Sequence, residues 1–87
     1  MSGIVDILCR ISDPTEMERF LSEVLTPAEL HDLALRWELM NKLSQGDSQR
    51  QIASQLGISL CKITRGAKIL KDEQSISRKF ITERKCL

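Results

Sequence analysis

A group of side chains suited to binding an anion lies in the second half of the chain: Lys62, Thr64, Arg65 and Lys68. If residues 60–70 form a helix, these side chains lie on its outward side. Lysine, arginine and threonine donate hydrogen bonds to phosphate oxygens and to base edges in the major groove of DNA. The pattern therefore indicates recognition of a nucleic acid.

The residue types needed for catalysis or metal binding are sparse. The chain has one histidine, His31, and three widely spaced cysteines, Cys9, Cys61 and Cys86. This spacing forms neither a CxxC metal site nor a paired disulfide framework, and it provides no Ser/His or Cys/His nucleophile. We therefore expect no enzyme activity, no metal site, and three free thiols in a reducing cytoplasm.

Residues 49–68 have the apolar pattern of a helix-turn-helix. Gly57 stands where the turn requires a left-handed residue, Ala53 is small where the two helices approach most closely, and Ser59 is the expected N-cap of the second helix. Residues 60–70 would then lie in a major groove, with the start of the first helix near a phosphate. The alternative is a helical hairpin with a basic, solvated face. The core of the motif is predicted to be Ile52, Leu56, Ile58 and Ile63. The DNA contacts are predicted to be Gln49, Arg50, Leu60, Cys61, Lys62, Thr64, Arg65 and Lys68.

Helix-start signals precede three segments. Thr26-Pro27-Ala28-Glu29 combines an N-cap hydroxyl, a proline at the first helical position and a glutamate that reaches back to the cap. Asp13-Pro14-Thr15-Glu16 repeats this arrangement, and Ser48 with Gln51 forms a further capping box. Gly46 is the expected helix terminator. With no alternating pattern or hairpin turn, we predict an all-α fold of about six short helices, at residues 4–11, 15–25, after 27, 49–56, 60–70 and 75–84.

Size and charge narrow the class of protein further. The 87 residues are 41% hydrophobic, which fits one small soluble domain, and the apolar runs are too short for a membrane span or a signal peptide. We therefore expect a cytoplasmic location and no membrane partner. Residues 1–35 carry seven acidic and two basic side chains, whereas residues 36–87 carry eleven basic and five acidic ones. This asymmetry favours a polyanionic partner for the second half.

The helix after Pro27 has more apolar surface than one helix face holds. The residues on one face are Leu30, Leu33, Ala34, Trp37, Met40 and Leu43, whereas Leu35 and Leu39 lie off it. A helix that is apolar on two sides needs two partners, and a short chain has few to offer. The pattern predicts a homodimer.

Several of these segments together resemble the tryptophan repressor family in order and spacing, from about residue 24 to residue 71. The residues that carry the resemblance are Leu25-Thr26-Pro27-Ala28-Glu29, Arg36, Gly46-Asp47-Ser48-Gln49-Arg50, Ile63-Thr64-Arg65-Gly66 and Leu70-Lys71. This family is itself a standard example of helix-turn-helix docking with water-mediated base contacts.

The resemblance implies an intertwined all-helical homodimer that represses transcription by binding a palindromic operator, with L-tryptophan as corepressor and no other cofactor. It implies a single domain over residues 1–87. Within that domain, residues 1–46 would form the dimer core, residues 47–71 the DNA-reading head and residues 72–87 a C-terminal helix.

The resemblance also implies a tryptophan site. The indole would lie between Arg36 and Arg65, the carboxylate would meet Arg65 and Thr26, and Gly66 would leave room for the ring. Backbone carbonyls near Glu23 and Leu25 of the other subunit would accept hydrogen bonds from the ammonium group.

The chain departs from the family pattern at positions that bear on its ligand and operator. Ile69 stands where the family commonly has a serine that helps to hold the ammonium group, and Lys62 replaces a threonine of the recognition helix. Ala53 replaces a basic residue, the loop before Ser48 is one residue shorter, and the N-terminal part is short. Two alternatives follow: a regulator of the same fold that senses another ligand or none, and a protein-interaction domain that retains the helix-turn-helix.

Overall fold

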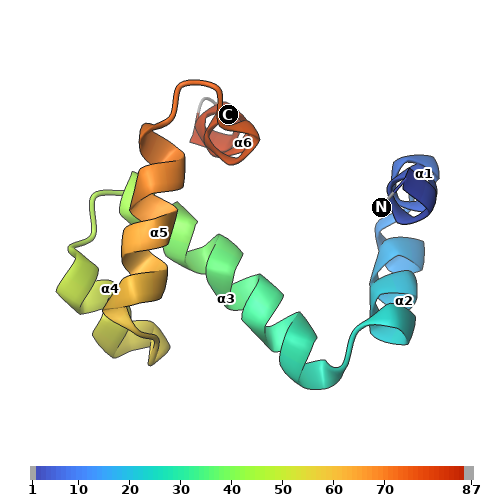
Figure 1. Ribbon diagram of the computed structural model, residues 1–87, viewed down its shortest axis with the longest axis horizontal. Coiled ribbons are helices and arrows are strands. Elements are labelled where there is room, and N and C mark those ends of the chain that lie inside the picture. Colours follow the sequence, from blue (N-terminus) through green and yellow to red (C-terminus); the bar gives the residue numbers. More distant parts are fainter. Residues whose placement is uncertain (1, 86–87) are drawn as a thin grey trace. The chain divides into compact units, whose positions relative to one another are not determined.

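The computed structural model describes residues 2–85, and within this range the chain is helical with no strand (Figure 1). The predicted all-α class is therefore confirmed, and the five segments predicted with both bounds agree with the structure within two residues. The helices are α1 (Ser2–Arg10), α2 (Pro14–Val24), α3 (Pro27–Ser44), α4 (Gln49–Leu56), α5 (Leu60–Lys71) and α6 (Ile76–Lys85). No helix in this range is both long enough and apolar enough to cross a bilayer.

The helix starts follow the predicted capping signals. At the start of α3, the Glu29 amide donates to Thr26 Oγ1 at 3.1 Å and the Thr26 amide donates to the Glu29 carboxylate at 2.8 Å. Ser48 and Gln51 make the same reciprocal pair at the start of α4, with both distances 3.1 Å. The Asp13 carboxylate caps α2. Each cap gives a partner to amides that would otherwise have none.

Two glycines end helices in the left-handed region. Gly46 has φ +96°, its amide donates to the Leu43 carbonyl and the Asp47 amide donates to the Lys42 carbonyl, both at 3.1 Å. This pair of bonds is a Schellman motif, which uses carbonyls left free at the end of α3. Gly57 has φ +64° and ends α4. A residue with a Cβ atom is disfavoured in this region, so both predicted glycine roles are confirmed.

The chain divides into two units, Met1–Asp32 and Leu33–Leu87. In the first unit, none of the side chains described at residues 3–32 is buried. Several of its apolar side chains are well exposed, with exposed fractions of 45% for Val5 and 50% for Val24. The first unit therefore contains no apolar core of its own.

The second unit has a small core formed by three helices. Leu39 of α3, Ile52 of α4 and Ile63 of α5 are 2%, 0% and 0% exposed. Leu56 and Ile58 pack against these three residues, as predicted for the helix-turn-helix. Ile81 of α6 is also buried, at 3% exposed.

The burial of Leu39 corrects one interpretation of the sequence. Leu39 was predicted to belong to apolar surface that only a second chain could cover, but it is covered by α4 and α5 of its own chain. Leu33, on the predicted apolar face of α3, is 49% exposed. The excess apolar surface of α3 thus includes Leu33 but not Leu39.

Candidate functional site

The second unit contains the predicted helix-turn-helix. α4 packs against α5, and the turn between them runs through Gly57 to Ser59, whose hydroxyl accepts from the Lys62 amide at 3.5 Å. Ile52 and Ile63 fix the two helices against each other because both are fully buried. The side of α5 away from this core is left exposed.

The exposed side of α5 carries most of the residues predicted to contact DNA. A shallow surface depression along it is lined by Leu60, Cys61, Thr64, Arg65 and Lys68. The Thr64 hydroxyl donates to the Leu60 carbonyl of its own helix at 2.9 Å. Thr64 therefore offers an outside partner its oxygen lone pairs and its methyl group, but not its hydroxyl proton.

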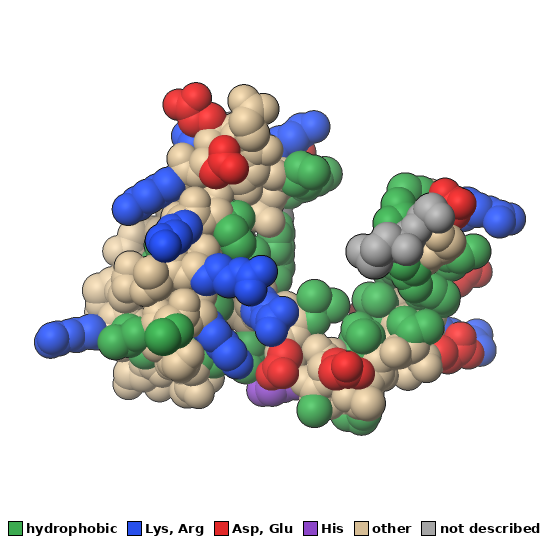
Figure 2. Space-filling view, in the orientation of Figure 1, with side chains coloured by type: hydrophobic (Ala, Val, Ile, Leu, Met, Phe, Trp, Pro, Cys, Tyr) green, Lys and Arg blue, Asp and Glu red, His purple; other side chains and the backbone are tan. Residues whose placement is uncertain are grey.

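Gln49 and Arg50 form the first turn of α4, and both side chains are exposed. α4 and α5 together carry five basic side chains and no acidic one. In Figure 2, lysine and arginine side chains form a band across the second unit. This charge distribution favours an anionic partner.

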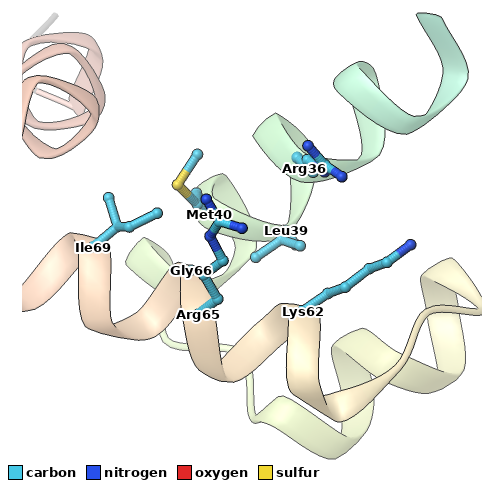
Figure 3. A pocket seen from close by; sticks show the side chains of 7 residues that line it. All are labelled: Arg36, Leu39, Met40, Lys62, Arg65, Gly66 and Ile69. Atoms are coloured by element: carbon cyan, nitrogen blue, oxygen red, sulfur yellow. The ribbon is translucent and has the colours of Figure 1, made fainter. Parts of the chain in front are cut away.

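A separate pocket of about 150 Å³ lies between α3 and α5, wholly within the second unit. Figure 3 shows its wall on the α5 side, where Lys62, Arg65 and Ile69 leave the helix toward α3. The pocket is lined by Arg36, Leu39, Met40, Lys62, Arg65, Gly66 and Ile69.

The close approach of α3 and α5 depends on Gly66, which is buried. A Cβ atom built on Gly66 would lie 2.5 Å from Leu39 Cδ1 and 3.4 Å from Met40 Cγ. The first distance is well inside van der Waals contact, so the absence of a side chain at residue 66 is what lets the two helices meet.

The structure brings three of the six predicted ligand residues together: Arg36, Arg65 and Gly66 line the same pocket. The other three lie in the first unit. Thr26 caps α3, and its hydroxyl retains a proton to donate, because it acts as an acceptor in the capping bond. Leu25 caps the end of α2, and Glu23 lines a groove between α1 and α2.

Ile69, which the family resemblance places near the ligand's ammonium group, also lines the pocket, and three further lining residues were not predicted: Lys62, Leu39 and Met40. Lys62 was predicted as a DNA contact only. The spacing of residues 62, 65, 66 and 69 places them on one face of a helix, and this periodicity is the sequence signal that could have placed Lys62 at the pocket.

Comparison with known proteins identifies the family. A family model described as "Trp repressor protein" matches residues 1–85. The chain is 41% identical over 70 residues to a "Trp operon repressor homolog" of Xylella fastidiosa strain M23, covering 79% of this chain and 76% of the relative. It is 34% identical over 76 residues to a protein of the same description from Vibrio parahaemolyticus, covering 86% and 74%.

No solved structure is a significant match to the chain. The family match nevertheless covers both the helix-turn-helix and the pocket between α3 and α5. The chain belongs to the Trp repressor family and is a repressor-like regulator of transcription.

Proposed function

We propose that the protein is a homodimeric repressor that binds a palindromic operator through α4 and α5, with L-tryptophan as corepressor. The observation that carries this proposal is the combination of two surfaces on α5. One surface is basic and exposed, and the other forms the wall of a pocket between two arginines. A ligand held in the pocket would therefore act on the helix that reads DNA.

The DNA-binding part rests on the charge and geometry of the helix-turn-helix. Lys68 and Arg65 lie on the exposed depression of α5, where they can reach base edges or phosphates. Arg50 is exposed in the first turn of α4, where a phosphate would lie in a docked helix-turn-helix. We propose that residues 47–71 act as the DNA-reading head.

The homodimer part rests on the first unit. None of the side chains described in this unit is buried. Its exposed apolar side chains include Ile4, Val5, Ile7 and Val24, which are 38%, 45%, 37% and 50% exposed. A folded segment with no buried apolar side chain gains too little from the hydrophobic effect to offset its conformational entropy. A second copy of the chain would supply the missing cover, so residues 1–46 would form the dimer core.

The ligand part rests on the two arginines of the pocket. A guanidinium pairs with a carboxylate and also stacks on an aromatic ring, so Arg36 and Arg65 suit an aromatic amino acid. A cavity of about 150 Å³ lined by apolar residues is known to hold a benzene ring. The pocket has a similar volume and is open to solvent, which gives a larger ring system room to extend.

Fluorescence anisotropy tests the whole proposal: a labelled operator palindrome is titrated with protein, with and without 1 mM L-tryptophan. L-Tryptophan should raise operator affinity, and operator DNA should raise tryptophan affinity by the same factor, because coupling between sites is reciprocal. Arg36→Ala should abolish the effect of tryptophan and leave nonspecific DNA binding nearly unchanged. Arg65→Ala should weaken both tryptophan binding and DNA binding, because Arg65 lines both the pocket and the exposed depression.

Two further variants test the placement of the helices. Lys62→Ala should weaken operator binding and relax its sequence preference, with a cost of about 1 to 3 kcal/mol for a lost base contact. Arg50→Ala should weaken binding to every sequence alike and reduce the salt dependence by about one phosphate contact. Equal losses with the same sequence profile would contradict this placement of α4 and α5.

A second candidate keeps the operator-binding dimer but assigns it a different ligand. The observation that favours it is Ile69, an apolar side chain on the pocket wall where the family commonly has a serine. Ile69→Ser should tighten L-tryptophan binding by up to roughly 1 kcal/mol if the ammonium group lacks a partner. Calorimetry with millimolar L-tryptophan distinguishes the two candidate functions. If L-tryptophan gives no heat of binding and does not change the affinity for operator DNA, the corepressor assignment is wrong.

A further inference from the structure

The exposed depression along α5 is apolar at one end and basic at the other. Leu60 and Cys61, at its N-terminal end, are both exposed, and Leu60 has an exposed fraction of 52%. Arg65 and Lys68 line its C-terminal end, with Thr64 between the two groups. An exposed leucine bordered by cations suits an apolar group that is itself flanked by negative charge better than it suits an apolar protein surface.

The apolar end of the depression lies at the part of α5 that a docked helix-turn-helix turns toward base pairs. In this motif the N-terminal residues of the second helix contact the base edges. Leu60 and Cys61 are the first two residues of α5. The buried Ile63 fixes the rotation of the helix, so these two side chains stay on the outward side. The apolar group that base pairs present in the major groove is the 5-methyl group of thymine.

Thr64 adds a methyl group to the same surface. Its hydroxyl donates to the Leu60 carbonyl at 2.9 Å. This bond holds the stiff, β-branched side chain in one rotamer and commits the hydroxyl proton to the helix. Thr64 therefore lacks a free donor for a base or a phosphate, and its methyl group is the part that can pack against another apolar group.

The composition of α5 limits which bases its side chains can read. Leu60–Lys71 contains no aspartate, glutamate, asparagine or glutamine. Aspartate and glutamate accept from the amino group of cytosine, and asparagine and glutamine pair with adenine through two hydrogen bonds. The donors of α5 are lysine and arginine, which suit the acceptors of guanine and the phosphates. Its side chains are thus equipped for thymine and guanine.

We propose that Leu60, Cys61 and the Thr64 methyl group form a methyl-reading surface, which packs against thymine 5-methyl groups and sets the base preference at the first turns of α5. This inference rests on the proposed function, because it takes α5 to be the DNA-reading helix, and it names the bases that this helix selects. The contact excludes water, in contrast to the water-mediated base contacts for which the family is a standard example.

Replacing thymine by uracil tests the methyl contact directly. A preferred half-site is first selected from a random double-stranded DNA library, with and without 1 mM L-tryptophan. Each dT of the selected site is then replaced by dU, which removes the 5-methyl group and keeps every hydrogen-bonding group. Fluorescence anisotropy at one fixed salt concentration gives the dT/dU affinity ratio at each position. At a contacted thymine the affinity should fall by roughly fourfold, or about 0.8 kcal/mol, for each lost methyl contact.

Variants of α5 assign the effect to this surface. Leu60→Ala removes the largest apolar side chain, so the dT/dU ratio should approach one at the thymine that Leu60 contacts. Thr64→Ser removes the methyl group and should lower the ratio, whereas Thr64→Val keeps a methyl group and should preserve it. Lys68→Ala is the control, because it should weaken binding to dT and dU sites equally and leave the ratio unchanged. Both Leu60 and Thr64 are exposed, and circular dichroism checks that each variant is folded.

The outcomes separate this inference from the proposed function. A selected half-site without thymine, or one in which no dU replacement lowers the affinity, overturns the inference and leaves sequence-specific DNA binding intact. A dT/dU ratio that neither Leu60→Ala nor Thr64→Ser lowers also overturns it, because another part of the protein then contacts the methyl group. If the unaltered protein selects no sequence under either condition, both the operator assignment and the methyl-reading surface are wrong.

Discussion

Adding one methyl group at Gly66 tests the packing that forms the pocket. In an ordinary helix interior, Gly→Ala stabilises a protein by about 1 kcal/mol, because alanine has the higher helix propensity. At Gly66 the new Cβ atom would lie 2.5 Å from Leu39 Cδ1, 3.4 Å from Met40 Cγ and 3.6 Å from Leu43 Cδ1. Leu39 cannot easily move aside, since it is 2% exposed and packed against α4 and α5.

The expected effect of Gly66→Ala on stability is the cost of overpacking the core minus the gain in helix propensity. Overpacking a core by one methyl group costs about 1 to 3 kcal/mol. Subtracting the propensity gain leaves a net destabilisation of about 1 kcal/mol, or roughly 4 to 8 °C in Tm for a domain of this size. Thermal unfolding followed by circular dichroism, at one fixed protein concentration, measures this shift.

Two controls distinguish the clash from other effects of the substitution. Gly3→Ala adds the same methyl group in α1, where no heavy atom lies within 4 Å of the new Cβ, so its Tm should not fall. In a Leu39→Val background the clashing Cδ1 atom is absent, and Gly66→Ala should become stabilising. If Gly66→Ala raises the Tm of the unaltered protein, α3 and α5 do not approach as described, and the argument for the pocket fails with it.

Three other substitutions, one of them with a matched control, test the stability of the second unit by the same measurement of Tm. Ser48→Ala removes a cap of α4 and should cost about 1 kcal/mol, whereas Ser54→Ala, at an exposed position inside α4, should cost much less. Gly57→Ala places a Cβ atom at φ +64° and should cost about 1 kcal/mol or more, even though the space around it is open. Ile52→Ala leaves a cavity at a fully buried position and should cost about 2 to 5 kcal/mol, enough to unfold a marginal domain.

Local signals made the helix boundaries predictable from the sequence. Capping boxes and terminating glycines act within a few residues, so Ser48 with Gln51 and the left-handed Gly57 could be identified without knowing the rest of the fold. The apolar core of the helix-turn-helix was predictable for a related reason. Ile52 and Ile63 recur at positions that the short turn forces together.

The rotation of α5 against α3 was not predictable in the same way. The sequence placed Lys62 outward with Thr64, and its side chain is exposed, but the sequence did not show that Lys62 also lines the pocket beside Gly66. Which face of a helix meets a neighbour depends on contacts between segments far apart in the sequence. Here the deciding contact is between Gly66 and Leu39. The same tertiary packing covers Leu39, whose apolar character alone could not show which partner it has.

α5 serves three surfaces at once, and this limits how a ligand can act on DNA binding. Ile63 fixes α5 in the core, Lys62 and Gly66 line the pocket, and Lys68 lies on the exposed depression. Because Ile63 is fully buried, α5 cannot rotate alone. A ligand can therefore act by moving α4 and α5 together against α3, or by neutralising charge at Lys62 or at Arg65, which lines both the pocket and the exposed depression. The two routes differ in the salt dependence of DNA binding. Neutralisation removes a cation from the DNA-facing helix, so the slope of log affinity against log salt should fall by up to about one phosphate contact. Rigid movement that keeps every contact leaves the slope unchanged. The slopes measured with and without bound L-tryptophan then decide which route couples the pocket to DNA.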